Sequence, residues 1–113
     1  MEMTAITRET VNNNPLFNDY QKMTINMGLS KGLDVSFYAD PKFNWDQMRH
    51  IYQGLKRGLD VSLYADTKFN ATQMEQIRLG LHKGLDASIY ADPGFTVLQM
   101  KEIRMRLKNY LGR

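Results

Sequence analysis

The chain has 113 residues, of which 42% are hydrophobic, and its 15 lysines and arginines exceed its 12 acidic residues, for a formal net charge of +3. This size and composition suit one domain with a continuous core, and the mild positive charge permits a nucleic-acid partner without requiring one. The lack of cysteine excludes disulfide bonds and thiolate metal sites.

The N-terminal segment, residues 1–14, is expected to be a loosely docked tail before a helical repeat domain that spans residues 15–113. Its start has neither the basic residues nor the apolar run of a secretion signal. No apolar stretch approaches the roughly 20 residues of a membrane span. We therefore expect a cytoplasmic protein with no membrane partner.

One stretch of 26 residues recurs along the chain without a gap. Its copies, called units below, begin at Phe17, Phe43, Phe69 and Phe95. Each carries a glutamine four residues later, at Gln21, Gln47, Gln73 and Gln99. A fixed period of about 20 to 50 residues indicates a repeat array in which neighbouring units share a core.

Each unit shows the signature of a helix start. A capping asparagine or threonine precedes the glutamine by three positions, at Asn18, Asn44, Asn70 and Thr96. In such a capping box, the two side chains bond reciprocally to each other's backbone N–H groups. Apolar residues at helical spacing follow, and in the first three units they lead to a glycine suited to a left-handed C-terminal cap. These signals predict long helices near residues 19–31, 45–57, 71–83 and 97–111.

The segment L-D-V-S-x-Y-A-D that links successive helices has two interpretations. As a short helix, it would be capped by its aspartate, at Asp34, Asp60 and Asp86. As a strand, the alternation from Val61 to Ala65 would suit a leucine-rich repeat. The asparagine ladder and L-x-L core of those repeats are missing, which favours the helix. The predicted fold is therefore all-α, a small solenoid of four tandem 26-residue repeats, each a short helix plus a longer helix.

Glycines inside the predicted helices indicate close packing. Gly28, Gly54 and Gly80 each cost about 1 kcal/mol relative to alanine, so we expect a neighbouring helix to approach them closely. The last unit carries Arg106 and Tyr110 at the two glycine positions. Bulky residues there are typical of a terminal unit with an atypical outer face.

No pattern indicates catalysis, a metal site or a cofactor. The repeated aspartates lack the dense oxygen spacing of a calcium loop and are interpreted as caps. His50 and His82 occupy non-equivalent positions without a metal-binding partner motif, and we expect both to be exposed. No unit contains a unique pair of nucleophile and base, so we do not expect an enzyme.

Residues that break the repeat symmetry are candidates for binding. Trp45, Arg49 and Tyr52 form a stripe at helical spacing, and these residue types are enriched in interface hot spots. The alternative is that this stripe packs against the preceding unit. A second candidate is the face that carries Met27 and Met105, which is either covered by the short helices, the interpretation we favour, or left for a partner.

A basic ridge is the third candidate. Lys31, Arg57 and Lys83 occupy equivalent positions in successive units, and the last helix is also basic. Such a ridge can track phosphates, although cations in a final helical turn also complement the helix dipole. The full set of predicted partner-binding residues is Trp45, Arg49, Tyr52, Arg78, Arg104, Arg106 and Lys108.

The phrase F-[NDT]-x-x-Q-M-x-x-I-R-x-G-L-x-x-G-L-D-V-S-x-Y-A-D-P, which covers residues 17–107, resembles a tandem repeat of proteins encoded by phages and conjugative elements of gut bacteria. The resemblance implies an accessory protein, such as an inhibitor of a CRISPR-type defence nuclease or its ribonucleoprotein. Together with the candidate residues, it favours a non-enzymatic protein-binding module that acts by occlusion as a monomer or weak homodimer. The alternative is a nucleic-acid-binding accessory protein that uses the basic ridge.

Overall fold

Four long helices begin and end where the sequence signals predict. The computed structural model describes residues 5–111 and contains α2 (Asp19–Ser30), α3 (Trp45–Lys56), α4 (Ala71–His82) and α5 (Val97–Leu111). Every predicted boundary is correct to within one residue. In α3, Asn44 Oδ1 accepts a hydrogen bond from the Gln47 backbone N–H over 2.8 Å, and Gln47 Oε1 accepts one from the Asn44 N–H over 2.9 Å. The capping box is therefore the physical start of the helix.

Glycine ends these helices by supplying a left-handed backbone. At the end of α3, Gly58 has φ of 71°, and the N–H of Leu59 donates to the carbonyl oxygen of Gly54 over 2.9 Å. These two features define a Schellman motif, which reverses the chain after the helix. The same geometry recurs at Gly32 and Gly84, with φ of 70° and 73°.

The links between the long helices are helical, as preferred from the sequence, but each is a single 3-10 turn. These turns are η1 (Val35–Phe37), η2 (Val61–Leu63) and η3 (Ala87–Ile89). The predicted aspartate caps are confirmed: Asp60 Oδ1, for example, accepts from the Ser62 N–H over 3.2 Å. Residues 5–111 contain no strand, so the alternative of a leucine-rich repeat is wrong.

A short helix, α1 (Arg8–Asn12), precedes the four long ones and packs on α2. Its Val11 is buried in the core, and Asn26 Nδ2 on α2 donates to Asn12 Oδ1 over 2.9 Å. Arg8 Nη2 also donates to Ser30 Oγ over 2.8 Å. This part of the predicted tail is therefore docked by specific side-chain contacts, whereas residues 1–4 lie outside the described residues.

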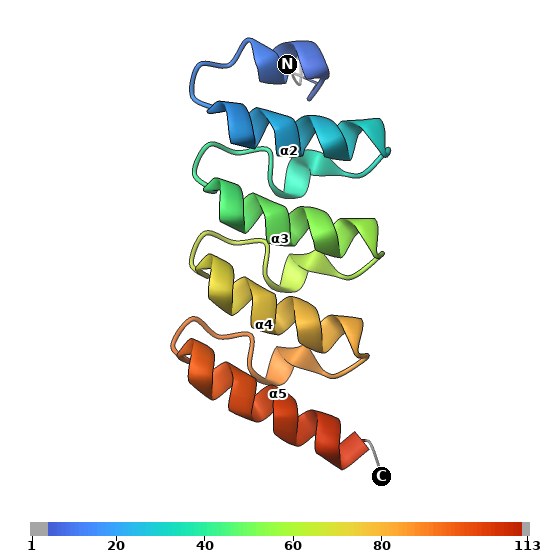
Figure 1. Cartoon of the computed structure of the whole chain (residues 1–113), viewed down its shortest axis with the longest axis vertical. Coiled ribbons are helices and arrows are strands. Elements are labelled where there is room, and N and C mark those ends of the chain that lie inside the picture. Colours follow the sequence, from blue (N-terminus) through green and yellow to red (C-terminus); the bar gives the residue numbers. More distant parts are fainter. Residues whose placement is uncertain (1–4, 112–113) are drawn as a thin grey trace.

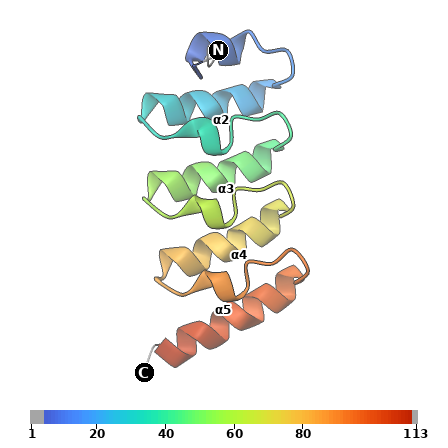
Figure 2. The ribbon, with the colours of Figure 1, turned by 180° about the vertical axis from the view of Figure 1, so that it is seen from behind.

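The helices are stacked side by side in chain order, with α1 and α5 at opposite ends of a body of 50 × 28 × 25 Å (Figure 1). Each helix packs mainly on its neighbours in the sequence, and the 3-10 turns fill the spaces between successive long helices, as the rear view shows (Figure 2). None of the helices in the described part of the chain is long and apolar enough to cross a membrane.

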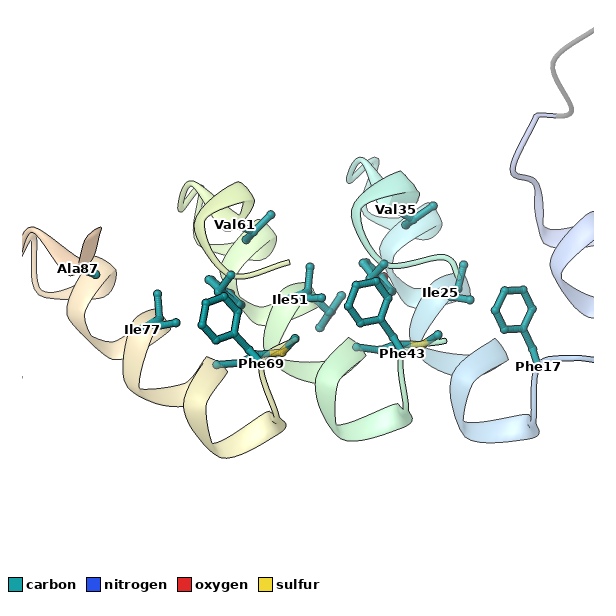
Figure 3. Packing of buried hydrophobic residues seen from close by; sticks show 14 of the residues in the cluster. Phe17, Ile25, Val35, Phe43, Ile51, Val61, Phe69, Ile77 and Ala87 are labelled. Atoms are coloured by element: carbon teal, nitrogen blue, oxygen red, sulfur yellow. The ribbon is translucent and has the colours of Figure 1, made fainter. Parts of the chain in front are cut away.

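Equivalent side chains recur in the core in each of the first three units (Figure 3). A phenylalanine before the helix, an isoleucine within it and a small apolar residue in the 3-10 turn are buried at equivalent positions. These sets are Phe17, Ile25 and Val35; Phe43, Ile51 and Val61; and Phe69, Ile77 and Ala87. One face of each helix and one side of each link are consequently buried, which leaves the opposite helix faces to form a separate surface.

The mid-helix glycines are close to a link, not to a neighbouring helix as the sequence analysis expects. A Cβ atom on Gly54 would lie 2.6 Å from Val61 Cγ1 and would overlap the hydroxyl of Tyr64. Both residues belong to the link that follows α3. The cost of glycine in the helix is offset because its missing side chain admits this buried tyrosine.

Candidate partner-binding groove

Between α2 and α3 the outer helix faces form a groove of about 280 Å³, here called the Trp45 groove. Its lining residues are Met23, Thr24, Met27, Trp45, Arg49, Tyr52, Gln53 and Lys56. The volume is at the lower end of the roughly 300–1,000 Å³ typical of small-molecule pockets. The groove combines apolar side chains with two cations, Arg49 and Lys56.

The tryptophan is held in place by its neighbours while part of it remains accessible. Its side chain is 36% exposed, and its ring centroid lies 5.5 Å from that of Tyr20 on α2, with an interplanar angle of 46°. The guanidinium carbon of Arg49 lies 5.6 Å from the Trp45 ring centroid. Because aromatic and cation–π contacts each restrict the indole, little side-chain entropy remains to be lost on binding.

The structure separates the three residues of the predicted stripe into a rim and a floor. Trp45 and Arg49 lie at the accessible edge, whereas Tyr52 is only 5% exposed. Lys56 Nζ lies 5.7 Å from the Tyr52 ring centroid. The alternative interpretation, packing against the preceding unit, is confirmed in part, since Tyr52 is buried and Trp45 contacts Tyr20 on α2. A binding role for the accessible part of Trp45 stays a prediction.

Arg78 and Arg104, which occupy the position of Tyr52 in the next two units, are engaged within the fold. Arg78 Nε donates to Nδ1 of His50 over 3.4 Å, and Arg104 Nε donates to Oε1 of Gln76 over 2.9 Å. Each arginine thus reaches back to the preceding helix and is half-buried. Part of the hydrogen-bonding capacity of both arginines is therefore already used within the fold.

His50 is buried, so the expectation that it is exposed is wrong. Burial, with the adjacent charges of Arg78 and Arg49 as further causes, lowers the pKa of His50 from 6.5 to about 4. A neutral imidazole is also what the contact with Arg78 requires, since Nδ1 must accept the hydrogen bond. His82 is exposed, as expected.

Arg106 and Lys108 are exposed on α5 and do not join the Trp45 groove, because α4 lies between α3 and α5 (Figure 1). The predicted partner-binding set therefore does not form one site. Its members Trp45, Arg49 and Tyr52 come together, whereas the two residues on α5 belong to a distant part of the surface.

The face with Met27 is open, which corrects the expectation that the short helices cover it. Met23 is 50% exposed and Met27 is 41% exposed, and both line the Trp45 groove. Sequence reasoning missed Met23 and the exposed Tyr20. Both differ from the equivalent residues of the next unit, Arg49 and Asp46, so the sequence shows that they break the repeat. Only the tertiary structure brings them next to Trp45.

A second groove, of about 450 Å³, lies on the other side of α2 and is called the Arg8 groove here. It is lined by Arg8, Met23, Asn26, Met27, Ser30 and Lys31. Since Met23 and Met27 line both grooves, the two form one continuous surface across α2. This surface could not be identified from the sequence, because Arg8 lies in the segment interpreted as a tail.

The described side chains offer no group of three or more histidine, cysteine, aspartate or glutamate residues that could hold a metal ion. The groove residues are an indole, a phenol, thioethers and cations, which suit recognition by packing and charge. Comparisons of the chain with protein-family models, with curated proteins and with solved structures found no match.

Proposed function

We propose that the chain is a solenoid of four tandem units that acts as a non-enzymatic binding module and holds a protein partner in the Trp45 groove. The observation that carries this proposal is the partly exposed tryptophan, fixed between Tyr20 and Arg49 beside exposed methionines. Rigid aromatic anchors with an arginine at a concave, mainly apolar surface are the features that dominate binding energy at protein interfaces.

Contacts that recur between units support the solenoid. Gln47 Nε2 donates to the carbonyl oxygen of Phe69 over 2.7 Å, and the first unit makes the equivalent bond from Gln21 to Phe43, also over 2.7 Å. In the third unit, Gln73 donates to Phe95 over 2.9 Å. An array held by nearest-neighbour contacts of this kind offers an extended surface for a macromolecule.

A binding module without chemistry would act by occlusion, that is, by covering a surface that its partner needs. The resemblance to repeats of phages and conjugative elements makes a bacterial defence effector, such as a CRISPR-type nuclease, the first target to test. This narrower proposal depends on the resemblance alone, because a fold does not define a function.

A nucleic-acid partner is the competing function, and one observation favours it. Lys31, Arg57 and Lys83 are exposed C-cap residues at the same position of successive helices. A partner bound through phosphates would dissociate steeply as the salt concentration rises. A partner bound around Trp45 would keep part of its affinity at high salt, because salt does not screen the apolar contacts with Trp45, Met23 and Met27.

The test is affinity capture from a bacterial lysate with the wild-type chain, with Trp45→Ala, and with Tyr110→Ala as the matched control. Tyr110 is an exposed aromatic residue on α5, far from the groove in the stack. Circular dichroism should show that both variants retain the helical fold.

We expect the wild type and Tyr110→Ala to retain one protein at high salt. Trp45→Ala should bind that protein at least about 30-fold more weakly, the change expected when a hot spot worth at least about 2 kcal/mol is removed. Recovery of nucleic acid alone, released by salt from all three proteins, would overturn the proposal in favour of the basic ridge.

A further inference from the structure

All the charged side chains that line the surface across α2 are positive, which restricts what can bind there. Arg8 and Lys31 line one groove, and Arg49 and Lys56 line the other. Neither set of lining residues contains an aspartate or a glutamate. Four cations therefore border one apolar centre.

These cations are little neutralised by the protein itself. Within residues 5–111, only Arg49 has a carboxylate within 4.0 Å, at 3.3 Å from Asp46, and both side chains of that pair are about half exposed. Such an exposed ion pair is weak, so a carboxylate from a partner can compete with it. The Arg49 guanidinium, whose carbon lies 5.6 Å from the Trp45 ring centroid, can donate to that carboxylate.

The centre between the cations is apolar and adaptable. Met23 and Met27 are shared by the two grooves, and about half of each side chain is accessible to solvent. The flexible thioethers adjust to apolar side chains of different shape. A complementary ligand must therefore carry apolar anchors in its middle and negative charges on both sides.

From this arrangement we infer that the occupant of the two grooves is an acidic amphipathic peptide segment of the partner, with its apolar side chains on the methionines and its carboxylates on the four cations. This inference depends on the proposed protein-binding function and specifies the partner. Its length should match α2, whose 12 residues span about 18 Å at 1.5 Å per residue.

The chemistry of the surface favours a peptide over a nucleic acid. Single-stranded nucleic acids bind by stacking bases on accessible aromatic rings along a track of positive charge. Here Tyr52 is buried, and Met23 and Met27 separate the two pairs of cations, so the positive charge does not form a continuous track. A peptide with carboxylates on both sides of an apolar segment matches this arrangement of cations around methionines better than a continuous chain of phosphates does.

Selection from a phage library of random 16-residue peptides tests the inference without a known partner. The baits are the wild type, Trp45→Ala, a double variant Lys31→Glu/Lys56→Glu, and a control Lys42→Glu/Lys68→Glu with the same change in charge outside the two grooves. All four replaced lysines are exposed, so each variant should fold.

We expect the wild type and the control to enrich peptides that combine aspartate or glutamate with leucine, phenylalanine or tryptophan. The groove variant Lys31→Glu/Lys56→Glu should bind these peptides at least about 10-fold more weakly, because each reversal removes an attraction and adds a repulsion. Trp45 is the only tryptophan of the chain, so its fluorescence reports on the groove. A synthetic copy of the most enriched peptide, made without tryptophan, should shift the fluorescence of Trp45 on binding.

Three results would overturn the inference. Enrichment of basic or uncharged peptides by the wild type would reject an acidic ligand while leaving the protein-binding groove intact. Peptides that do not distinguish the wild type from Trp45→Ala would contradict the groove as a binding site altogether. Stronger quenching of Trp45 fluorescence by a single-stranded oligonucleotide than by the enriched peptide would replace the peptide with a nucleic acid.

Discussion

The hydroxyl of Tyr64 donates a hydrogen bond to the carbonyl oxygen of His50 over 2.6 Å, across 14 residues of sequence. The tyrosine ring lies where a side chain on Gly54 would otherwise be, and burial raises its pKa. The equivalent bonds run from Tyr38 to Thr24 over 2.8 Å and from Tyr90 to Gln76 over 2.6 Å. One buried tyrosine thus joins each link to the helix that precedes it.

Gly54→Ala should destabilise the protein although alanine is the better helix former. The added methyl group would overlap Tyr64 and Val61, and overpacking of this kind typically costs about 1–3 kcal/mol, which exceeds the gain of about 1 kcal/mol in helix propensity. Urea unfolding measures the difference. Arg106→Ala at the same position of α5 is the control and should change stability by less than about 0.5 kcal/mol, because Arg106 is exposed. A stabilised Gly54→Ala variant would contradict this packing.

Gln47→Glu should weaken the junction between the second and third units. A glutamate still caps the helix through its oxygens, but it has no N–H to donate to the Phe69 carbonyl oxygen, now 2.7 Å from Nε2. We expect a loss of about 1–3 kcal/mol in the free energy of unfolding. Gln99→Glu in α5 is the matched control, since Gln99 is exposed and its Oε1 accepts a hydrogen bond from the Thr96 backbone N–H over 2.8 Å. Equal losses of unfolding free energy in both variants would show that the hydrogen bond from Gln47 to Phe69 does not stabilise the junction.

Stability should decrease in mild acid because of His50. Its pKa is lowered from 6.5 to about 4, so the stabilisation is complete above pH 6.5 and is lost as the pH falls through 4. Protonation would remove the acceptor of Arg78 and place two cations together, although Glu75 and Asp46 partly compensate. The effect at pH 5 should be on the order of 1 kcal/mol.

The variant His50→Gln copies the residue found at the equivalent position, Gln76, which accepts a hydrogen bond from Arg104 over 2.9 Å. Thermal unfolding of the wild type and of this variant between pH 7 and pH 4.5 should show a steeper loss of stability for the wild type. Parallel pH profiles would exclude His50 as the source of the acid sensitivity.

The buried tyrosines should make the protein sensitive to alkali. Burial raises the pKa of Tyr90 from 10.0 to about 12, and burial also raises the pKa values of Tyr38 and Tyr64. The neutral phenols are favoured in the folded state, so this stability is complete below pH 10 and is lost as the pH rises through 12. Tyrosinate absorbance and circular dichroism should change together. Tyr90→Phe should reduce the pH dependence and cost about 1 kcal/mol at pH 8, because it removes the hydrogen bond from Tyr90 to the Gln76 carbonyl oxygen.

The sequence alone determined the period, the helix boundaries and the caps. Asn44 and Gln47 form their capping box within three residues, and Gly58 adopts its left-handed backbone without help from distant residues. Such local signals act through neighbouring backbone groups, so they can be recognised before the fold is known. The break of symmetry at Trp45 and Arg49 could likewise be identified from the repeat, but the groove that these residues line could not.

Only the tertiary structure decided which of these residues are buried and which surfaces are open. His50 is covered because Arg78, 28 residues later, and a link 14 residues away both bond to it. Trp45 becomes part of a groove because α2 brings methionines beside it. Burial depends on contacts between units, and these are set by how one unit packs on the next, a geometry that no single 26-residue copy contains.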